Sequence, residues 1–237
     1  MIKSPRDALV LALDNVSAHS SLQTLVDQTA DVIGVFKIGL ELFTRFGPPV
    51  LEVVRSAGRK IFLDLKFHDI PNTVAKAVAS AGMLGIDYLT IHTQGGLEMM
   101  VAAKTAAQRC DRPPKIIGVT LLTSIGEESL RKELTVTLDT ASYAHHLASL
   151  ARDAGLDGIV CSAADLPQIK PQLPETFEFI TPGIRPAGTA AHDQKRITTP
   201  AKAIKNGATL LVLGRTVTEA NNPARAALSI LNEISGI

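Results

Sequence analysis

The sequence predicts an α/β fold, a single-domain (β/α)8 barrel (TIM barrel) spanning residues 1–237. Eight apolar segments of strand type alternate with segments of helical periodicity, and strands that alternate with helices pair in parallel. The length of 237 residues is close to the about 250 residues that such a barrel typically has. The nearest rival, a doubly wound open sheet, would carry a GxGxxG motif after its first strand, and none follows here.

The expected strands are short apolar runs that end in small, polar or charged residues. They cover residues 8–14, 35–39, 61–66, 88–93, 115–122, 158–162, 177–181 and 210–215. Ser17 is expected to cap the first helix. Pro48 and Pro49 open the second helix, and Gly58 closes it. Further helices are expected over residues 71–84, 97–109, 140–154, 163–169, 199–206 and 223–234, with a short charged segment at 127–134.

The composition excludes several classes of protein. A net charge of +1 and only 4% aromatic residues argue against a nucleic-acid-binding surface. Cys110 and Cys161 are far apart and belong to no CxxC pair, so neither a disulfide framework nor a zinc cluster is expected. No apolar run approaches the roughly 18 residues of a membrane span, and the N-terminus shows no signal-peptide cleavage pattern. We therefore expect a cytoplasmic protein with no nucleic-acid or membrane partner.

Charged residues gather where several expected strands end. Because side chains alternate along a strand, Phe62, Asp64 and Lys66 share one face. Asp14 and Lys37 also lie at or near strand ends, and barrel enzymes place their active sites at the carboxyl ends of the strands. Opposite charges in a dry site keep one another ionised, which favours electrostatic stabilisation and proton delivery. The alternative interpretation is a structural ion pair between a strand end and a loop.

A second group of residues suits an anionic ligand. Barrels frequently bind phosphate with the loops after strands seven and eight, and Gly214 and Arg215 end the eighth expected strand. The loop over residues 184–198 carries Arg185, Gly188, Gln194, Lys195 and Arg196. Long loops of this kind are usually functional, and we interpret this one as a lid over a phosphate. The alternative is that this loop is simply flexible and covers no ligand.

The segment over residues 64–73, DLKFHDIPNT, resembles the signature of the orotidine 5′-phosphate decarboxylase family. The resemblance extends along the chain through residues 11–14, 36–39, 121–124, 181–185 and 213–215. The DxKxxD core alone is shared with sugar-phosphate lyases of the same barrel superfamily. Lys37 distinguishes the decarboxylase family from these lyases, because the metal-dependent relatives place an acidic metal ligand near the end of strand two. A cation there would repel a divalent ion, which favours the decarboxylase, with no metal and no cofactor.

The resemblance also implies roles for individual residues. Lys66 would protonate C6 of the pyrimidine after carbon dioxide leaves, and Asp64, Asp69 and Lys37 would complete a charged catalytic array. Substrate contacts would come from Asp14, Lys37, Thr73, Thr123, Ser124, Pro182, Arg185, Gln194, Gly214 and Arg215. The family is a homodimer, in which Asp69 and Thr73 would reach the partner's site.

The implied activity is conversion of orotidine 5′-phosphate (OMP) to UMP and carbon dioxide, a step of pyrimidine (UMP) biosynthesis. Two alternatives stay open on the sequence. A metal-dependent sugar-phosphate lyase or aldolase would share the DxKxxD core, and a nucleotide-binding regulator would keep the pocket without turnover. The intact Asp64, Lys66 and Asp69 argue against the regulator.

Overall fold

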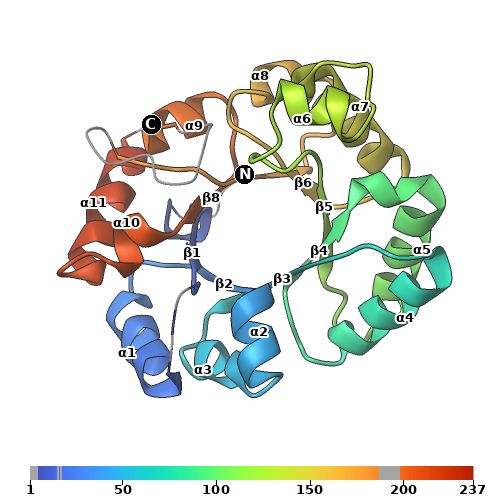
Figure 1. Cartoon of the computed structure of the whole chain (residues 1–237). Coiled ribbons are helices and arrows are strands. Elements are labelled where there is room, and N and C mark those ends of the chain that lie inside the picture. The colour runs from blue at the N-terminus through green and yellow to red at the C-terminus, as the bar shows by residue number, and fades with distance from the viewer. Residues whose placement is uncertain (1–4, 15, 17, 187–197, 237) are drawn as a thin grey trace.

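The computed structural model of the chain describes residues 5–14, 16, 18–186 and 198–236. Within these residues, eight parallel strands close into a barrel in chain order, with β8 paired to β1 (Figure 1). The strands are β1 Leu9–Ala12, β2 Val35–Gly39, β3 Lys60–Phe67, β4 Tyr88–His92, β5 Lys115–Val119, β6 Gly158–Val160, β7 Glu178–Thr181 and β8 Leu210–Leu213. The predicted (β/α)8 barrel is confirmed.

The helices form an outer ring around the strands (Figure 1). They are α1 His19–Thr29, α2 Leu40–Phe46, α3 Val50–Ser56, α4 Pro71–Gly82, α5 Gly96–Gln108, α6 Glu127–Lys132, α7 Thr140–Asp153, α8 Leu166–Ile169, α9 Pro200–Lys205, α10 Arg215–Thr218 and α11 Pro223–Ser235. Three short 3-10 turns are η1 Pro5–Ala8, η2 Thr93–Gly95 and η3 Lys170–Gln172. Each connection between consecutive strands contains a helix, and this supplies the crossover that parallel pairing requires.

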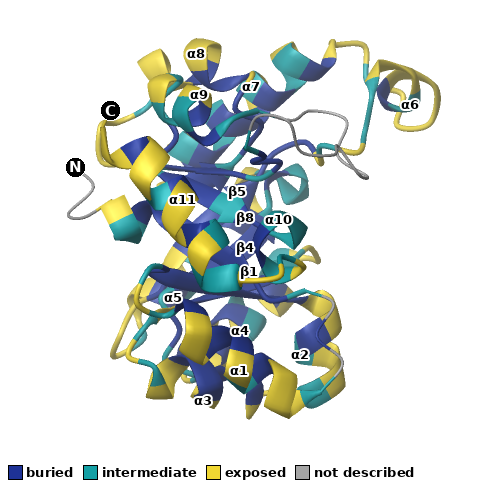
Figure 2. Ribbon diagram, turned by 90° about the vertical axis from the view of Figure 1, so that its left-hand side faces the viewer, coloured by how far each residue is buried: buried dark blue, intermediate teal, exposed yellow. Residues whose placement is uncertain are grey.

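The strands are buried on both faces, as Figure 2 shows for the centre of the molecule. One set of side chains packs inside the barrel: Val10, Val35, Phe62, Tyr88, Ile117, Ile180 and Leu210, with Val160 and Val212 against them. Their neighbours along the strands, such as Leu11 and Leu63, belong to the larger core between strands and helices. Because side chains alternate, Lys37, Asp64 and Thr90 each lie two residues beyond an interior residue, on the side of the barrel where the strands end.

Several strands end earlier than the sequence predicts. β1 ends at Ala12, β5 at Val119, β6 at Val160 and β8 at Leu213. Asp14 therefore lies in the loop after β1, and Arg215 begins α10 instead of ending a strand. The apolar runs continue past these points because Leu13, Leu121 and Cys161 are buried although they lie beyond the strand ends, so hydrophobicity alone overestimates strand length.

The connection from β2 to β3 also differs from the prediction of a single helix opened by Pro48 and Pro49. The structure has two helices there, α2 and α3, separated at Gly47, whose φ is 64°. The first helix was missed because it is only seven residues long, and short apolar runs do not distinguish a helix from a loop. Leu42 is buried, and Phe43 and Phe46 pack against the core beside it. Gly58 does adopt the left-handed conformation expected after α3, with a φ of 65°. The expected cap Ser17 lies outside the described residues.

Candidate active site

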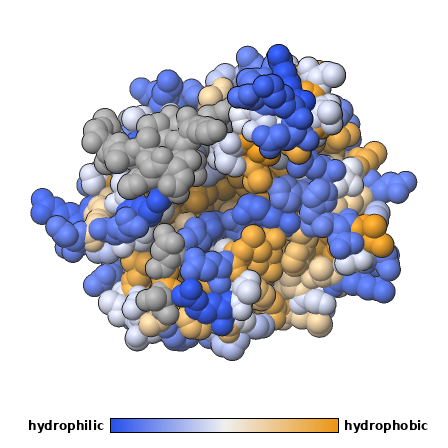
Figure 3. Space-filling model, in the orientation of Figure 1, coloured by the Kyte–Doolittle hydropathy of each residue, from blue (hydrophilic) through white to orange (hydrophobic). Residues whose placement is uncertain are grey.

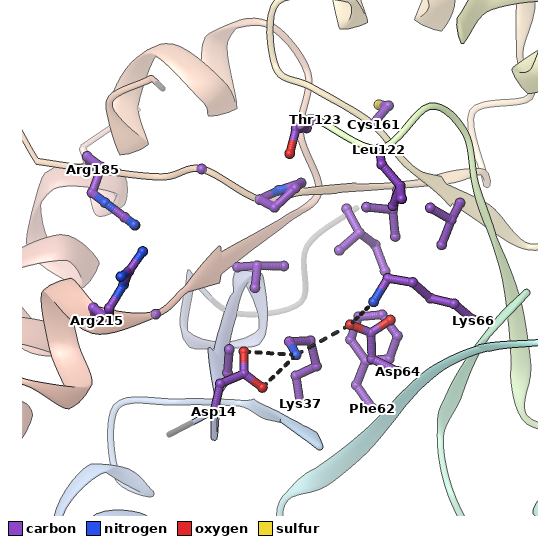
Figure 4. A pocket seen from close by; sticks show the side chains of 18 of the residues that line it. Asp14, Lys37, Phe62, Asp64, Lys66, Leu122, Thr123, Cys161, Arg185 and Arg215 are labelled. Atoms are coloured by element: carbon purple, nitrogen blue, oxygen red, sulfur yellow. Dashed lines mark hydrogen bonds and ion pairs between the residues drawn. The ribbon is translucent and has the colours of Figure 1, made fainter. Parts of the chain in front are cut away.

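A pocket of about 500 Å³ opens at the carboxyl ends of the strands (Figure 4). Its lining includes nine of the residues that the sequence singled out: Asp14, Lys37, Asp64, Lys66, Thr123, Pro182, Arg185, Gly214 and Arg215. They come from six different strand ends or the loops that follow them. The pocket is therefore assembled by closure of the barrel, in the position where barrel enzymes bind substrates.

The charged groups form one connected array at one end of this pocket (Figure 4). Lys37 Nζ lies 3.2 Å and 3.3 Å from the two carboxylate oxygens of Asp14. It also lies 3.3 Å from Oδ2 of Asp64, and the same oxygen accepts a hydrogen bond of 2.9 Å from Lys66 Nζ. Asp64 thus lies between two ammonium groups, and the order of charges is Asp14, Lys37, Asp64, Lys66.

Gly39, at the end of β2, makes room for the first of these contacts. A Cβ at this position would lie 2.8 Å from Oδ1 of Asp14 and 3.1 Å from Nζ of Lys37. The first distance is shorter than real Cβ contacts allow, so a larger residue would push Asp14 away. The absence of a side chain at Gly39 is what lets the carboxylate and the ammonium group meet.

The array keeps Lys37 and Asp64 ionised although both are buried. Burial by itself would raise the pKa of Asp64, but the cations of Lys37 and Lys66 outweigh it and hold the pKa below the usual value. Burial would likewise lower the pKa of Lys37, but Asp64 and Asp14 outweigh it and raise the pKa. The centre of the array therefore holds a buried charge of each sign, Lys37 and Asp64.

The backbone at Lys66 is unusual. Its φ is 51°, and among the described residues only Thr135 is another non-glycine residue with positive φ. The pairing of β3 with β4 shifts register between Leu63 and Phe67, on either side of this residue. A non-glycine residue in the left-handed region costs about 1–2 kcal/mol, and such strain is concentrated at functional sites. From this irregular stretch the Lys66 side chain reaches the pocket, with its nitrogen toward Asp64 (Figure 4).

Two guanidinium groups lie at the other end of the pocket, Arg185 and Arg215, and they point toward each other (Figure 4). Arg185 is 6% exposed, and its backbone N–H donates to the carbonyl of Thr198 at 2.9 Å. The Thr198 N–H donates to the carbonyl of Gly183 at 3.2 Å, which holds the two ends of the long loop together. Paired forked donors of this kind suit a phosphate group.

Three of the expected site residues that the structure describes are not brought together with the others. Asp69, Thr73 and Ser124 are exposed and lie outside the pocket lining, and the Asp69 carboxylate accepts from the backbone N–H of Ile70 at 2.6 Å. The array within one chain therefore contains Lys37, Asp64 and Lys66 but not Asp69. Gln194 lies outside the described residues, as does most of the expected lid, residues 187–197.

The apolar wall of the pocket was not predicted as part of the site. It includes Phe62, Val119, Leu121, Leu122, Cys161, Ile180 and Val212. Strand alternation could have identified Phe62, which lies two residues before Asp64 on the same face. The residues of the other strands need the barrel register to be placed. Burial raises the pKa of the Cys161 thiol, which argues against a cysteine nucleophile.

Other features of the described residues bear on the class of protein. No three His, Cys, Asp or Glu side chains in this part of the chain lie close enough together to hold a metal ion. None of the described helices is both long and apolar enough to cross a membrane. Cys110 and Cys161 are both free thiols.

Comparison with known proteins gives a consistent result. The model of the orotidine 5′-phosphate decarboxylase / HUMPS family matches residues 7–230. The protein named orotidine 5′-phosphate decarboxylase of Saccharophagus degradans is 47% identical over 231 residues, which cover 98% of this chain and 96% of that protein. Its namesake in Moorella thermoacetica is 43% identical over 234 residues, which cover 97% and 92% of the two chains.

Solved structures agree with these relatives. The crystal structure of orotidine 5′-phosphate decarboxylase from Lactobacillus acidophilus superposes with a TM-score of 0.84 at 34% identity and covers 96% of this chain and 99% of its own. The protein of the same name from Pyrococcus horikoshii shares the fold, with a TM-score of 0.77 at 24% identity and coverage of 97% and 100%. With the family model matching almost the whole chain, this protein belongs to the orotidine 5′-phosphate decarboxylase / HUMPS family.

Proposed function

We propose that this chain converts OMP to UMP and carbon dioxide, as a carboxy-lyase of pyrimidine biosynthesis, without a metal or a cofactor. The observation that carries the proposal is the array of Lys37, Asp64 and Lys66 at one end of a pocket that has Arg185 and Arg215 at the other. The names of the curated relatives support the same substrate. In this proposal a single domain, residues 1–237, carries the activity.

The chemistry explains why such an array is needed. Loss of carbon dioxide leaves an electron pair on C6 of the pyrimidine, and the ring offers that carbanion no electron sink. The activation barrier must then be lowered by charged groups that are already in place, because preorganised groups need no reorganisation during the reaction. Lys66 has a side chain that is 28% exposed and lies in the pocket lining, so its ammonium group can both stabilise the carbanion and donate a proton to C6.

The remaining contacts position the substrate. Asp14 and Lys37 would bind the ribose hydroxyls, and Thr123 and Ser124 would lie near the pyrimidine beside Pro182. Gly214, Arg185 and Arg215, with Gln194 of the loop, would bind the phosphate. Binding energy gained at the phosphate, far from the reacting carbon, can hold the pyrimidine against the array and so raise the rate of the chemical step.

The proposed activity is tested by following the loss of orotate-ring absorbance with OMP in excess chelator. We expect full turnover under these conditions. No turnover, or turnover that requires added magnesium, would contradict the proposal. The family also includes HUMPS members, and activity on a keto-sugar phosphate with a divalent metal would favour the lyase alternative.

We also propose that two copies of the chain form a homodimer. Ile70 is 66% exposed, Leu97 44% and Val101 43%, at the start of α4 and in the first half of α5. In Figure 3, apolar residues lie among hydrophilic ones on the side of the molecule where α4 and α5 are found. Exposed apolar patches of this kind mark interfaces. The neighbouring Asp69 and Thr73 are exposed as well, which would let them reach the partner's substrate.

The cellular location is part of the same proposal. Cys110 and Cys161 are unpaired, which fits a reducing compartment. We therefore place this biosynthetic enzyme in the cytoplasm, with OMP and UMP as its ligands and without a nucleic-acid or membrane partner.

A further inference from the structure

We infer that Thr90, on β4, is a positioning residue that fixes both Asp64 and Lys66 for the proposed decarboxylation. Its hydroxyl donates a hydrogen bond of 2.9 Å to Oδ1 of Asp64 and accepts one of 2.9 Å from the backbone N–H of Lys66. One side chain thus holds the carboxylate and the backbone of the expected proton donor at the same time. The inference rests on the proposed function.

The direction of the two bonds follows from their partners. A backbone N–H can only donate, so the Thr90 oxygen must accept from Lys66. The single hydroxyl hydrogen is then available for the carboxylate of Asp64, which can only accept. Thr90 is 0% exposed, so water does not compete for either bond. A residue without a hydroxyl would leave a buried carboxylate oxygen and a backbone N–H without these partners.

The bond to Asp64 sets the rotation of its carboxylate. With Oδ1 held by Thr90, the other oxygen, Oδ2, faces Lys37 and Lys66 and contacts both. If the carboxylate turned, the two ammonium groups would no longer share one oxygen. Thr90 therefore helps to determine where the positive charges lie relative to the pocket.

The bond to Lys66 supports its unusual backbone. The ladder between β3 and β4 is interrupted between Leu63 and Phe67, and Lys66 has a φ of 51°. The side chain of Thr90 gives the Lys66 N–H a partner within this interruption. Polar side chains that replace ladder bonds in this way stabilise local departures from regular structure.

Thr90 acts through other residues and not on the substrate itself. It does not belong to the described residues that line the pocket, whereas Asp64 and Lys66 do. Its neighbours on the same face of β4 are Tyr88, in the interior core, and His92, whose ring lies 5.3 Å from that of His68. Its loss should consequently change the rate of the chemical step more than the binding of OMP.

The test compares kcat and KM for OMP in the full chain and four variants. Thr90→Val and Thr90→Ala remove the hydroxyl, and each should lower kcat about 10- to 100-fold, the usual effect of losing support for a reacting group. KM should change less than about threefold, because ground-state contacts remain. Thr90→Ser keeps the hydroxyl and should restore most of the activity. Thr29→Val, which removes an equally buried hydroxyl bonded to a helix carbonyl, should leave kcat unchanged.

The outcomes separate positioning from simple stability. A folded Thr90→Val or Thr90→Ala with wild-type kcat would overturn the inference, and so would a Thr90→Ser as impaired as Thr90→Val. Failure of both hydroxyl-free variants to fold would assign Thr90 a structural role instead. If the wild-type chain does not turn over OMP, the proposed function fails. Carboxyl titration by NMR still decides the inference in that case, since Thr90→Val should raise the pKa of Asp64 and Thr90→Ser should not.

Discussion

Lys66 Nζ donates to Oδ2 of Asp64 at 2.9 Å, although the two residues lie only two positions apart on the same strand. Side chains at this spacing lie on the same face of a strand, so a long lysine side chain can reach back to the aspartate. Lys66 also has a φ of 51°, outside strand geometry. The ion pair on which the proposed chemistry depends therefore lies in the irregular part of β3, where the pairing with β4 shifts register.

Lys66→Ala should abolish decarboxylation. Loss of a general acid typically costs 10²–10⁴-fold and loss of an electrostatic contact 10²–10³-fold, so we expect kcat to fall by at least about 10³-fold. Binding of UMP, measured by calorimetry, should remain within about tenfold of wild type, because the phosphate and ribose contacts persist. Lys60→Ala is the matched control, since Lys60 is exposed at the opposite end of β3. A Lys66→Ala enzyme with near wild-type turnover would remove Lys66 as proton donor.

Arg215→Ala should mainly weaken binding of phosphate-bearing ligands. A hydrogen bond to a charged group contributes about 1.5–3 kcal/mol, which corresponds to a rise in KM for OMP of about 10- to 150-fold. The rate with orotidine, which lacks the phosphate, should hardly change. Arg109→Ala, at an exposed position after α5, serves as the control. An unchanged KM would place Arg215 outside the phosphate site.

Asp64→Asn should lower the free energy of unfolding at pH 7 by about 1.5–3 kcal/mol, the contribution of a hydrogen bond to a charged group. Lys37 keeps Asp14 as a partner, but both Lys37 and Lys66 lose the Asp64 carboxylate. In the wild type this contribution depends on pH. The pKa of Asp64 is lower in the folded state than in the unfolded state, so the stabilisation is present above about pH 4 and is lost as the pH falls through the folded value.

The pKa of Lys37 is raised by folding, so its contribution is complete below about pH 10 and declines as the pH rises through the folded value. Urea unfolding between pH 3 and pH 11 measures the free energy of unfolding on both the acid and the alkaline side. On the acid side, this free energy should fall more steeply with decreasing pH in the wild type than in Asp64→Asn. Parallel curves for the two proteins below pH 5 would show that Asp64 is not ion-paired in solution.

Ile70→Asp should dissociate the proposed homodimer. The change puts an unpaired charge into the exposed apolar patch at the start of α4, and burial of an unpaired charge is costly. Light scattering after size exclusion should report a monomer, and activity should fall because Asp69 and Thr73 no longer reach a second site. Met83→Asp provides the control, since Met83 is 82% exposed at the other end of α4. A wild-type monomer, or a dimeric Ile70→Asp protein with full activity, would contradict the proposal.

The alternation of apolar strands and periodic helices was sufficient to predict the barrel, because each element must bury its apolar face. The charged residues of the site could also be identified, since an acid and a base at the end of a buried strand are conspicuous. Their convergence follows from the parallel order of the strands. The sequence pattern failed to predict α2 and α10 because they are only seven and four residues long, too short for a helical period to be recognised.

The sequence by itself therefore determined the fold class, the residues that carry charge and the family that they resemble. Only the tertiary structure decided that Asp64 lies between Lys37 and Lys66 through a single oxygen atom, and that Asp69 points elsewhere within one chain. It also revealed Thr90, because a threonine on a strand has no distinguishing pattern until a register shift brings the Lys66 N–H to its hydroxyl. Distances between strands depend on how the barrel closes, and no local segment of the sequence encodes that closure.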